Sequence, residues 1–379
     1  MKRYTYYLHH ILAAVSLLFA VSASAQQSSK TFKVMTLNVD GMPQKILFVD
    51  ANSDGPGILG SIAISKYVAS KDCDIVAMQE DFNYNLEIQS LLLLKYSHDE
   101  WSGGIMTSDC KVDYAHLHRN KFPTDGLNMS WKRGSKSTAY ERVAWEKAFG
   151  KFSHDFDDMI TKGFRCHEMV LQNGLEVVVY NMHMDASNER DEKAGNDGKD
   201  REARLSQWEQ LRDYILSRMD RRPVIVMGDM NSLYHRDDVK NVFIDYINNT
   251  GLATAGDAWV ELQLNGNYPQ YGQTVIQDEL LDKVIYINPA NTQTPLVPKL
   301  AELDTTGYLK DGKPLGDHFP LIVTFAVDEA SAVDGMPENP SVQTDGAPVY
   351  TVQGTLATPD QNGILIKNGK KYYKNRSSK

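Results

Sequence analysis

The chain contains six short segments of the kind that form buried β-strands. Each is rich in valine and isoleucine, and several are almost continuously apolar, which is typical of strands covered on both faces. They comprise residues 33–40, 74–80, 175–185, 223–231, 282–289 and 320–327. We therefore expect sheets whose strands lie between other layers of structure.

Helical patterns separate these strand-like segments. In residues 201–223, five apolar side chains fall on one stripe: Leu205, Trp208, Leu211, Ile215 and Met219. Pro223 is expected to stop this helix, and a second helix is predicted over 57–71, directly after Gly55-Pro56. Strands that alternate with helices predict an α/β protein in which helices cover sheets.

Three regions depart from this alternation. Residues 97–163 are rich in Trp, His, Lys and Gly and have weak periodicity, so we interpret them as an ordered but irregular insert in a main domain over 26–327. Residues 328–346 are acidic and contain proline, as a linker would. Residues 347–379 offer two short β-like runs, the second with an Asn-Gly turn, and predict a short β-rich tail, most simply a passive appendage.

The N-terminus has the pattern of a secretory signal peptide over residues 1–25. Lys2 and Arg3 precede an apolar stretch, and Ala23-Ser24-Ala25 provides a small-residue cleavage site. We expect a mature protein that begins near Gln26 and is secreted, periplasmic or on the cell surface. The tail resembles those of secreted proteins from Bacteroidetes-type bacteria, which predicts a Gram-negative source.

The net charge argues mildly against a protein that holds nucleic acid on a broad basic face. The formal charge is -9, and removal of Lys2 and Arg3 with the signal peptide lowers it by two, to -11. A small local basic patch would still be compatible with this balance.

Three cysteines are too few for a disulfide framework. Cys73 enters an apolar run and is predicted to be buried and unreactive. Cys110 and Cys166 are candidates for a pair in an oxidising compartment, although the sequence does not show their separation.

Polar residues mark the edges of the six strand-like segments. They are Asn38, Glu80, Asn181, His183, Asp185, Asp229, Asn231, Asp282, Asp317 and His318. The stretch Gly-Asp-Met-Asn after 224–227 is by itself a good turn sequence, but alternate residues of an extended chain point to one side. Because every segment ends or begins with such groups, we predict one pocket where the sheet edges converge.

These blocks, in this order, resemble the endonuclease/exonuclease/phosphatase superfamily. The resemblance spans about residues 31–327, and it implies a four-layered α/β sandwich of two packed mixed sheets flanked by helices. The last block departs from the commoner Ser-Asp-His, because Gly316 precedes Asp317 and His318. The insert also departs from the nuclease pattern.

The resemblance implies a divalent cation, Mg²⁺ or alternatively Mn²⁺ or Ca²⁺, bound by Glu80 with Asn38 beside it. Carboxylate and amide oxygens suit such hard cations. The resemblance also implies that Asp229 orients the attacking water and that Asn231 and Asn181 contact the phosphate. An acid that accepts from water beside an amide that donates to phosphate is chemically sensible.

The resemblance implies catalytic roles for both strand-edge histidines. His318, next to Asp317, is expected to pair with Asp282, and we favour it as the general base. His183 is expected to give a proton or hydrogen bond to the leaving oxygen. Asp185 is a weaker candidate for tuning His183.

Within the superfamily, the chain looks most like secreted sphingomyelinase or phospholipase C enzymes. Trp101, Trp131 and Trp145, together with the basic stretch 132–136, suit a membrane interface, although they suit the insert's own core equally well. The predicted substrate is a sphingophospholipid at a membrane surface, hydrolysed by a monomer. The alternatives are a secreted nuclease, an inositol-phosphate or other phosphatase, and, least favoured, a non-catalytic binding module.

Overall fold

The structure is a computed structural model. It describes residues 31–46, 49–50, 52–101, 124–150, 157, 160–187, 198–274, 278–327, 349–351, 363–367 and 370–374. The chain divides into two compact units, Met1–Ala332 and Val333–Lys379. The predicted signal peptide and linker, and Cys110, lie outside the described residues.

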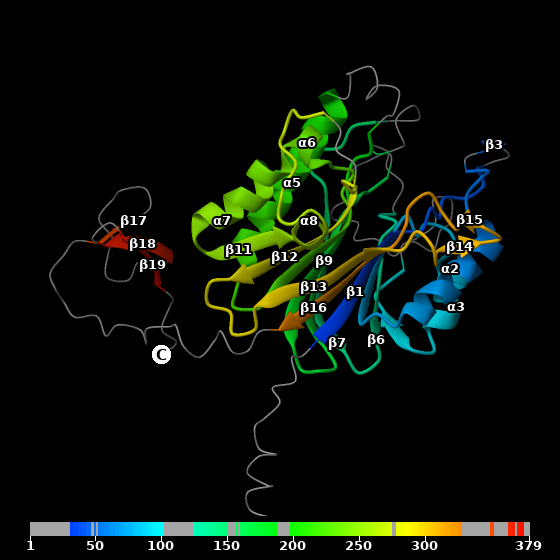
Figure 1. Ribbon diagram of the computed structural model, residues 1–379, viewed down its shortest axis with the longest axis horizontal. Coiled ribbons are helices and arrows are strands. Elements are labelled where there is room, and N and C mark those ends of the chain that lie inside the picture. The colour runs from blue at the N-terminus through cyan, green and yellow to red at the C-terminus, as the bar shows by residue number, and fades with distance from the viewer. Residues whose placement is uncertain are drawn as a thin grey trace, which may run out of the picture. The chain divides into compact units, whose positions relative to one another are not determined.

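Two six-stranded mixed sheets form the body of the first unit (Figure 1). The first sheet has the order β13 (Leu296–Leu303), β16 (Leu321–Val327), β1 (Thr31–Asn38), β4 (Ile75–Gln79), β6 (Asn128–Lys132) and β5 (Tyr96–His98). The second has the order β11 (Ala253–Asp257), β12 (Asp282–Pro289), β10 (Val224–Asp229), β9 (Glu176–His183), β8 (Gly163–Val170) and β7 (Lys136–Ala144). All six predicted strands are present.

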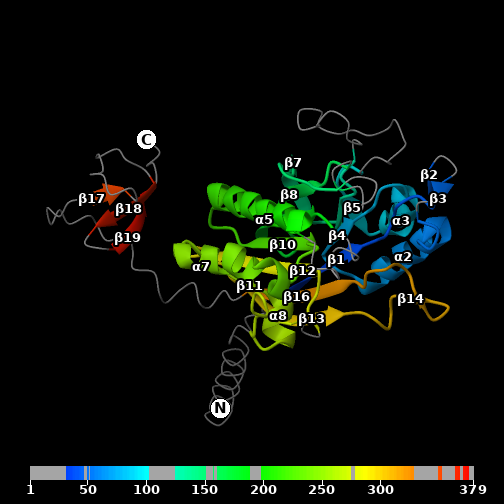
Figure 2. The ribbon, with the colours of Figure 1, turned by 90° about the horizontal axis from the view of Figure 1, so that it is seen from above.

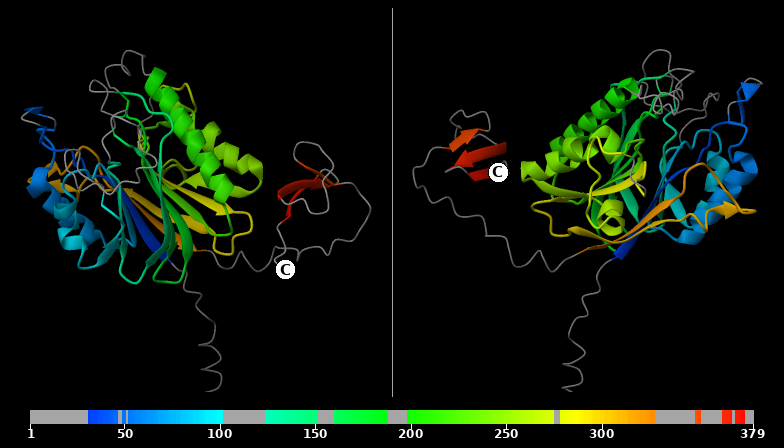
Figure 3. Two further views of the ribbon diagram at one scale, coloured as in Figure 1. Left: turned by 180° about the vertical axis from the view of Figure 1, so that it is seen from behind. Right: turned by 45° about the horizontal axis from the view of Figure 1, so that its top comes forward.

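Helices cover the outer face of each sheet, as Figures 2 and 3 show. The first sheet is covered by α2 (Gly57–Lys71) and α3 (Asn85–Leu92), and the second by α5 (Gly198–Arg218), η2 (Lys240–Asp245) and α7 (Tyr246–Thr250). A central apolar cluster, which includes Val34, Ile75, Val179 and Ile225, fills the space between the sheets. The predicted four-layered α/β sandwich is therefore confirmed.

The two sheets repeat one pairing pattern, with a single parallel pair at the centre of each. β1 and β4 are parallel and are joined through α2, while β9 and β10 are parallel and are joined through α5. All the other neighbours are antiparallel. The carboxyl ends of the two parallel pairs are where four of the predicted site residues lie.

The interpretation of residues 97–163 as an irregular insert is wrong for their described central part. β6 lies between β4 and β5 in the first sheet, and β7 forms an edge of the second. β7 is mostly exposed, so its side chains lack the apolar pattern by which a buried strand is recognised in sequence.

The tryptophans of this region are largely buried, which favours the core alternative over a membrane-facing patch. Trp131 is 8% exposed and packs in the core between the sheets, and Trp145 is 2% exposed beneath α5. Partly exposed Trp101 stacks on His98. The basic neighbour Lys132 pairs with aspartates on the same sheet.

The smaller elements are α6 (Tyr234–Asp237), α8 (Ala258–Gln263) and two short hairpins, β2 (Lys45–Ile46) with β3 (Val49–Asp50) and β14 (Leu309–Lys310) with β15 (Lys313–Pro314). In the second unit, β17 (Val349–Thr351), β18 (Gly363–Lys367) and β19 (Lys370–Lys374) form an antiparallel sheet, one strand more than the two runs predicted. Among the described residues, no helix has both the length and the apolar character needed to cross a bilayer.

Candidate active site

Strand register brings three polar side chains of the second sheet into one row. Asp229, at the end of β10, lies opposite His183 of β9 on one side and opposite Asp282 of β12 on the other. Directly opposed residues of neighbouring strands point to the same face. Asp282 therefore comes from the start of the antiparallel strand β12, whereas His183 and Asp229 come from the ends of the parallel strands β9 and β10.

The Gly-Asp-Met-Asn stretch is both a turn and part of the site. The backbone N–H of Asn231 donates to Asp229 Oδ1 at 2.9 Å, and Asn231 has a left-handed φ of 46°. Gly228 has a φ of 153°, and a Cβ there would lie 2.0 Å from the carbonyl oxygen of Met182. Only glycine allows β10 to approach β9 so closely at this point.

Asp229 is the centre of the site. Its Oδ2 lies 3.1 Å from Nδ2 of Asn38, 3.5 Å from Nε2 of His183 and 3.6 Å from Nε2 of His318. Asn38 comes from β1 of the first sheet, so its amide joins the two sheets at this edge. Burial opposes the charge of Asp229, but the adjacent His318 holds the pKa of this carboxyl below its usual range.

His318 and Asp282 form the predicted couple. Nδ1 of His318 lies 2.7 Å from Asp282 Oδ2, which leaves Nε2 directed toward Asp229. Although burial opposes a positive charge, Asp282 and Asp229 raise the pKa of His318 well above the usual histidine range. This direction favours the imidazolium form, which suits a proton donor, whereas the predicted role of His318 as the base stays a prediction.

His183 is held neutral by its surroundings. Burial and the neighbouring Lys162 lower the pKa of His183 to about 3. Lys162 Nζ lies 3.2 Å from His183 Nε2, so the ammonium donates and the imidazole accepts. The lowered pKa favours the neutral imidazole, and the role of His183 toward the leaving oxygen stays a prediction.

Lys162 was not assigned a role from the sequence. It is buried just before β8, forms an ion pair with Asp157 and donates to the carbonyl oxygen of Met184 at 3.2 Å. Burial opposes its charge, but Asp157 and Glu80 raise the pKa of Lys162 above its usual value. A lysine followed by Gly163 at the start of a strand gives no sign of burial by itself, since lysines are usually exposed.

Three carboxylates gather on the other side of Asn38. Burial raises the pKa of Glu80 to about 7, and Asp317 and Asp40 add to the rise. Burial and Asp317 likewise raise the pKa of Asp40 to about 6. Asn38 Nδ2 donates to Glu80 Oε1 at 2.9 Å, while its Oδ1 accepts from the N–H of Asp40. This crowding of negative oxygen donors fits a hard divalent cation.

Asp229, Asp282 and His318 could also hold a metal ion, since their ligand atoms lie within 4.8 Å of one another. The Asp282–His318 hydrogen bond would have to separate for a cation to bind both residues. We therefore assign this trio to proton handling and place the predicted cation at Glu80. Asp40, which the sequence stretch Asn-Val-Asp-Gly presents as an ordinary turn residue, joins the candidate ligands.

The predicted phosphate contact of Asn181 is wrong. Its side chain is fully buried, Oδ1 accepts from Gln79 at 2.8 Å, and Nδ2 donates to the carbonyl oxygens of Met78 and Asn128. Both amide hydrogens are therefore in use, and the residue fastens the two sheets together. Its position two residues before His183 did not distinguish this structural role from a binding role.

Asn231 keeps a hydrogen-bond donor available at the site, whereas the carboxylate of Asp185 is used by other parts of the protein. Asn231 donates one amide hydrogen to the carbonyl oxygen of Met184 at 3.1 Å, and an asparagine has a second to offer. Asp185 accepts from Phe149 N at 2.6 Å and from Gln207 Nε2 at 2.7 Å. Asp185 therefore orders the surrounding loops, and Lys162 is the group that tunes His183.

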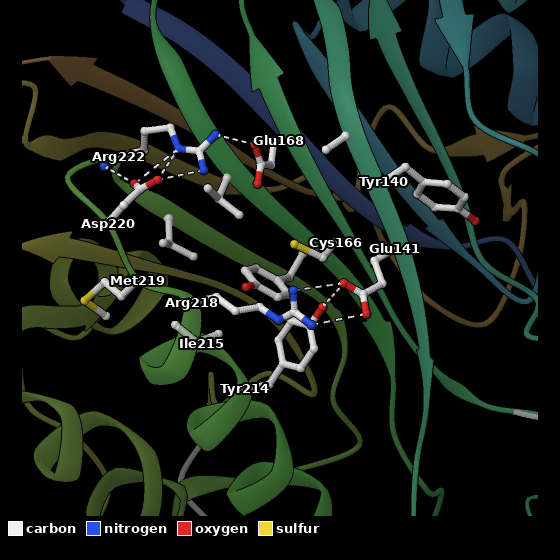
Figure 4. Close-up of a pocket in the computed structure, with 14 residues that line it drawn as sticks. Tyr140, Glu141, Cys166, Glu168, Tyr214, Ile215, Arg218, Met219, Asp220 and Arg222 are labelled. Atoms are coloured by element: carbon white, nitrogen blue, oxygen red, sulfur yellow. Dashed lines mark hydrogen bonds and ion pairs between the residues drawn. The ribbon is translucent and has the colours of Figure 1, made fainter. Parts of the chain in front are cut away.

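The pocket drawn in Figure 4 is separate from this site. It lies between the outer face of β7, β8 and β9 and the end of α5, with a volume of about 190 Å³. Its arginines are paired within the pocket: Arg218 with Glu141, and Arg222 with Glu168 and Asp220. Both arginines are therefore neutralised by the three carboxylates of the same pocket.

Cys166 lines the same pocket and is a free thiol, as is buried Cys73. Burial raises the pKa of Cys166 to about 11, although a hydrogen bond with Tyr180 lowers it in part. Cys110, the predicted partner of Cys166, lies outside the described residues, so their pairing stays a prediction.

The profile of the Endonuclease/Exonuclease/phosphatase family matches residues 35–274. This is well over half of the sequence, so the chain belongs to that family. Its members are hydrolases that act on phosphate esters and are typically dependent on a divalent metal ion. No curated protein matches the chain significantly.

Solved structures share the fold. A humanized TDP2 from D. rerio is 16% identical, with a TM-score of 0.51 over 78% of this chain and 98% of that chain. A family member from Bacteroides thetaiotaomicron is 16% identical, with a TM-score of 0.49 over 79% and 99% of the two chains. The beta toxin of Staphylococcus aureus is 16% identical, with a TM-score of 0.48 over 77% and 99%. At 16% identity, the likeness to the TDP2 structure is one of fold.

Replacement of Glu80 by Gln should weaken metal binding with little effect on the fold. The amide keeps the size of the side chain but removes the anionic oxygen that a hard cation prefers. We expect the Mg²⁺ concentration for half-maximal activity to rise at least about tenfold, because loss of even a supporting interaction at a metal site generally costs about 10–100-fold. Glu87→Gln, on neighbouring α3, is the matched control. Equal Mg²⁺ titrations of Glu80→Gln and the parent would exclude Glu80 as a ligand.

The metal-free protein should lose stability as the pH rises from about 5 to 7. Burial raises the pKa values of Glu80, Asp81 and Asp185 to about 7 in each case. Between its unfolded and folded pKa values each such group binds a proton only in the folded state, so it lowers the free energy of unfolding by up to about 1.4 kcal/mol per pH unit, and this decline ends as the group ionises in the folded protein. His183 has a lowered pKa, so it offsets part of the decline below the ordinary histidine value of about 6.5.

Urea unfolding in chelator at several pH values checks this expectation. Asp81→Asn should flatten the decline, because the amide cannot ionise, whereas Asp54→Asn at an exposed position should not. A free energy of unfolding that is constant or rises over this range would contradict the assignment of these carboxyls as protonated.

Proposed function

We propose that this protein is a metal-dependent phosphodiesterase of the sphingomyelinase or phospholipase C type, which releases a phosphorylated head group from a sphingophospholipid. The proposal rests chiefly on the arrangement of side chains around Asp229. One carboxylate faces two histidines whose pKa values are shifted in opposite directions, and Asn38 links it to the carboxylate that suits a metal ion.

The residues divide the chemistry of phosphate-ester hydrolysis between them. Asp229 is ionised and orients the attacking water, accepting its hydrogen bond. The His318 imidazolium, steadied by Asp282, stabilises the charge that builds on the phosphoryl oxygens and has a proton to give. The second amide hydrogen of Asn231 is available to a phosphate oxygen. A divalent cation at Glu80, when bound, supplies Lewis-acid stabilisation of the same oxygens.

His183 and Lys162 have a positioning role in this scheme. The neutral imidazole of His183 approaches Asp229 without adding a positive charge, so Asp229 keeps its capacity to accept. Lys162 places a buried positive charge behind Glu80 and His183. Fixed charges of this kind need no rearrangement as the transition state forms.

The charge around the site supports a substrate with a single phosphodiester over a nucleic-acid strand. Asp40, Glu80 and exposed Asp317 place three carboxyl groups at the site and no excess of basic residues is seen there among the residues named, and the chain carries a net charge of -9. A nucleic acid requires several phosphates to be neutralised along its length. A TDP2 structure of the same fold holds a single-stranded DNA product, so a nuclease remains the alternative to be tested.

The N-terminal pattern supports export as part of the proposal. A signal peptide over residues 1–25 would bring the enzyme to extracytoplasmic phospholipids or dietary lipids. N-terminal sequencing of the protein recovered from the periplasm or medium checks this, and a start near Gln26 is the expected result.

A substrate panel tests the activity. Purified enzyme is incubated in Mg²⁺ and in chelator with sphingomyelin, phosphatidylcholine, plasmid DNA and inositol phosphates. Metal-dependent release of phosphocholine from sphingomyelin, absent in His318→Ala, is the expected result. Efficient cleavage of DNA without head-group release would replace the lipid assignment by a nuclease.

A further inference from the structure

The outer face of α2 and α3 exposes large apolar side chains. Leu59 is 71% exposed, and Leu94, just beyond α3, is 77% exposed. We call the whole set the α2–α3 apolar face: Ile58, Leu59 and Ile62 of α2, and Leu86, Leu91 and Leu94 in and just after α3. Single exposed apolar residues are normal on soluble proteins, but a group on neighbouring elements marks an interaction surface.

The two helices form one surface. α2 and α3 pack against each other, and the backbone N–H of Leu91 donates to Ser65 Oγ at 3.1 Å. Ile58 and Ile62 are one turn apart on α2, so they lie on the same side of that helix. Figure 1 shows α2 and α3 side by side on the outer face of the first sheet.

This surface reaches the edge of the sandwich that carries the site. Parallel strands β1 and β4 end at Asn38 and Gln79, and a helix begins after each, at Gly57 and Asn85. Both helices therefore start at the same sheet edge as the candidate metal ligands. Leu86 lies in the first turn of α3, shortly after Glu80 along the chain.

We propose that the α2–α3 apolar face docks the enzyme on a zwitterionic phospholipid surface, with the mouth of the site facing the head groups. The proposal rests on the proposed function, whose substrate lies in such a surface. Amphipathic helices bind at the interface by burying their apolar face in the head-group and acyl boundary.

The charges favour a zwitterionic surface over an anionic one. The chain has a net charge of -9, which an anionic membrane would repel. The exposed charges near the face are mixed, with Lys66, Lys95 and Arg133 against Asp54 and Asp72. The apolar residues must therefore provide the attraction, and six Ile and Leu side chains are suited to lipid and not to a strand of phosphates.

A vesicle-binding experiment in the absence of turnover tests the face. His318→Ala enzyme in chelator is sedimented with large unilamellar phosphatidylcholine vesicles. The added substitutions Leu59→Gln, Ile62→Gln and Leu94→Gln should reduce partitioning at least about tenfold, since each removes apolar area that would enter the lipid. Leu300→Gln, at a 53% exposed position of β13, is the matched control and should leave partitioning unchanged.

The active form of the triple variant separates docking from chemistry. It should keep the parent's turnover of soluble bis(p-nitrophenyl) phosphate while losing most of its activity on lipid in vesicles. Equal vesicle binding by the parent and the triple variant would overturn the proposal, as would parental binding to phosphatidylglycerol but not to phosphatidylcholine. A parental dimer that the triple substitution converts to a monomer would assign the face to a second copy and likewise overturn it.

Different experimental results would refute the docking face and the proposed function. Vesicle binding that depends on the face, without head-group release by the active enzyme, would refute the phospholipase activity and leave the docking surface standing. Head-group release that is unaffected by the triple substitution would refute the surface and leave the activity standing.

Discussion

Replacement of His318 by Ala should lower turnover by about two to four orders of magnitude, the usual range for a group that handles a proton in the transition state. The substitution removes the imidazolium that lies between Asp282 and Asp229. It leaves two buried carboxylates close together without a cation between them. Steady-state rates on a soluble phosphodiester, with the fold checked by circular dichroism, measure the loss.

Asp282→Asn should reduce turnover less than His318→Ala does and should change the pH profile. Asp282 raises the pKa of His318, so its neutralisation should shift the loss of activity on the alkaline side to lower pH. A His183→Ala/His318→Ala double variant should lose less than the product of the single effects, because residues that act as a unit are not additive. Full activity of Asp282→Asn with an unchanged pH profile would refute the couple.

Replacement of Lys162 by Met should damage both stability and catalysis. The buried Asp157 would lose its ion-pair partner, and breaking a buried pair in this way typically costs about 3–5 kcal/mol of unfolding free energy. We also expect turnover to fall by about 10²-fold, the scale for loss of a preorganised charge beside the reacting groups. Lys132→Met, which breaks a partly exposed pair with Asp72, should cost about 1 kcal/mol or less.

A second variant distinguishes the two effects. Lys162→Met/Asp157→Asn removes both charges and should recover most of the stability, yet turnover should remain low. Burial and Lys162 together lower the pKa of His183, so NMR titration of the imidazole should show a higher pKa in both variants. Recovery of activity together with stability, and an unmoved His183 titration, would reduce Lys162 to a purely structural residue.

Much of the architecture follows from local pattern. The runs around Val34, Val76, Val179 and Ile225 are apolar because both faces of these strands are covered, and such runs are visible without knowledge of the fold. The stripe that includes Trp208 and Leu211 similarly predicted α5, whose buried face packs on the second sheet. The mostly exposed β7 left no such pattern and was missed.

The site was predictable to the extent that it lies at strand ends. Asn38, Glu80, His183 and Asp229 follow apolar runs, and the carboxyl ends of parallel strands share one edge of a sheet. The sequence thus determined which groups meet. It could not determine their protonation states, because these depend on distances to groups far away in the chain, such as Lys162 beside His183 and Asp282 beside His318.

Tertiary structure alone decided which polar and apolar residues are available to a ligand. Asn181 and Asn231 are alike in sequence context, but packing between the sheets consumes the hydrogen-bonding groups of Asn181 and leaves Asn231 at the edge. Trp131 is buried between the sheets, whereas Leu59 faces outward. Side-chain chemistry sets what a residue can bind. Its exposure is set by the layer that covers it, and that layer is built from strands and helices distant in the sequence.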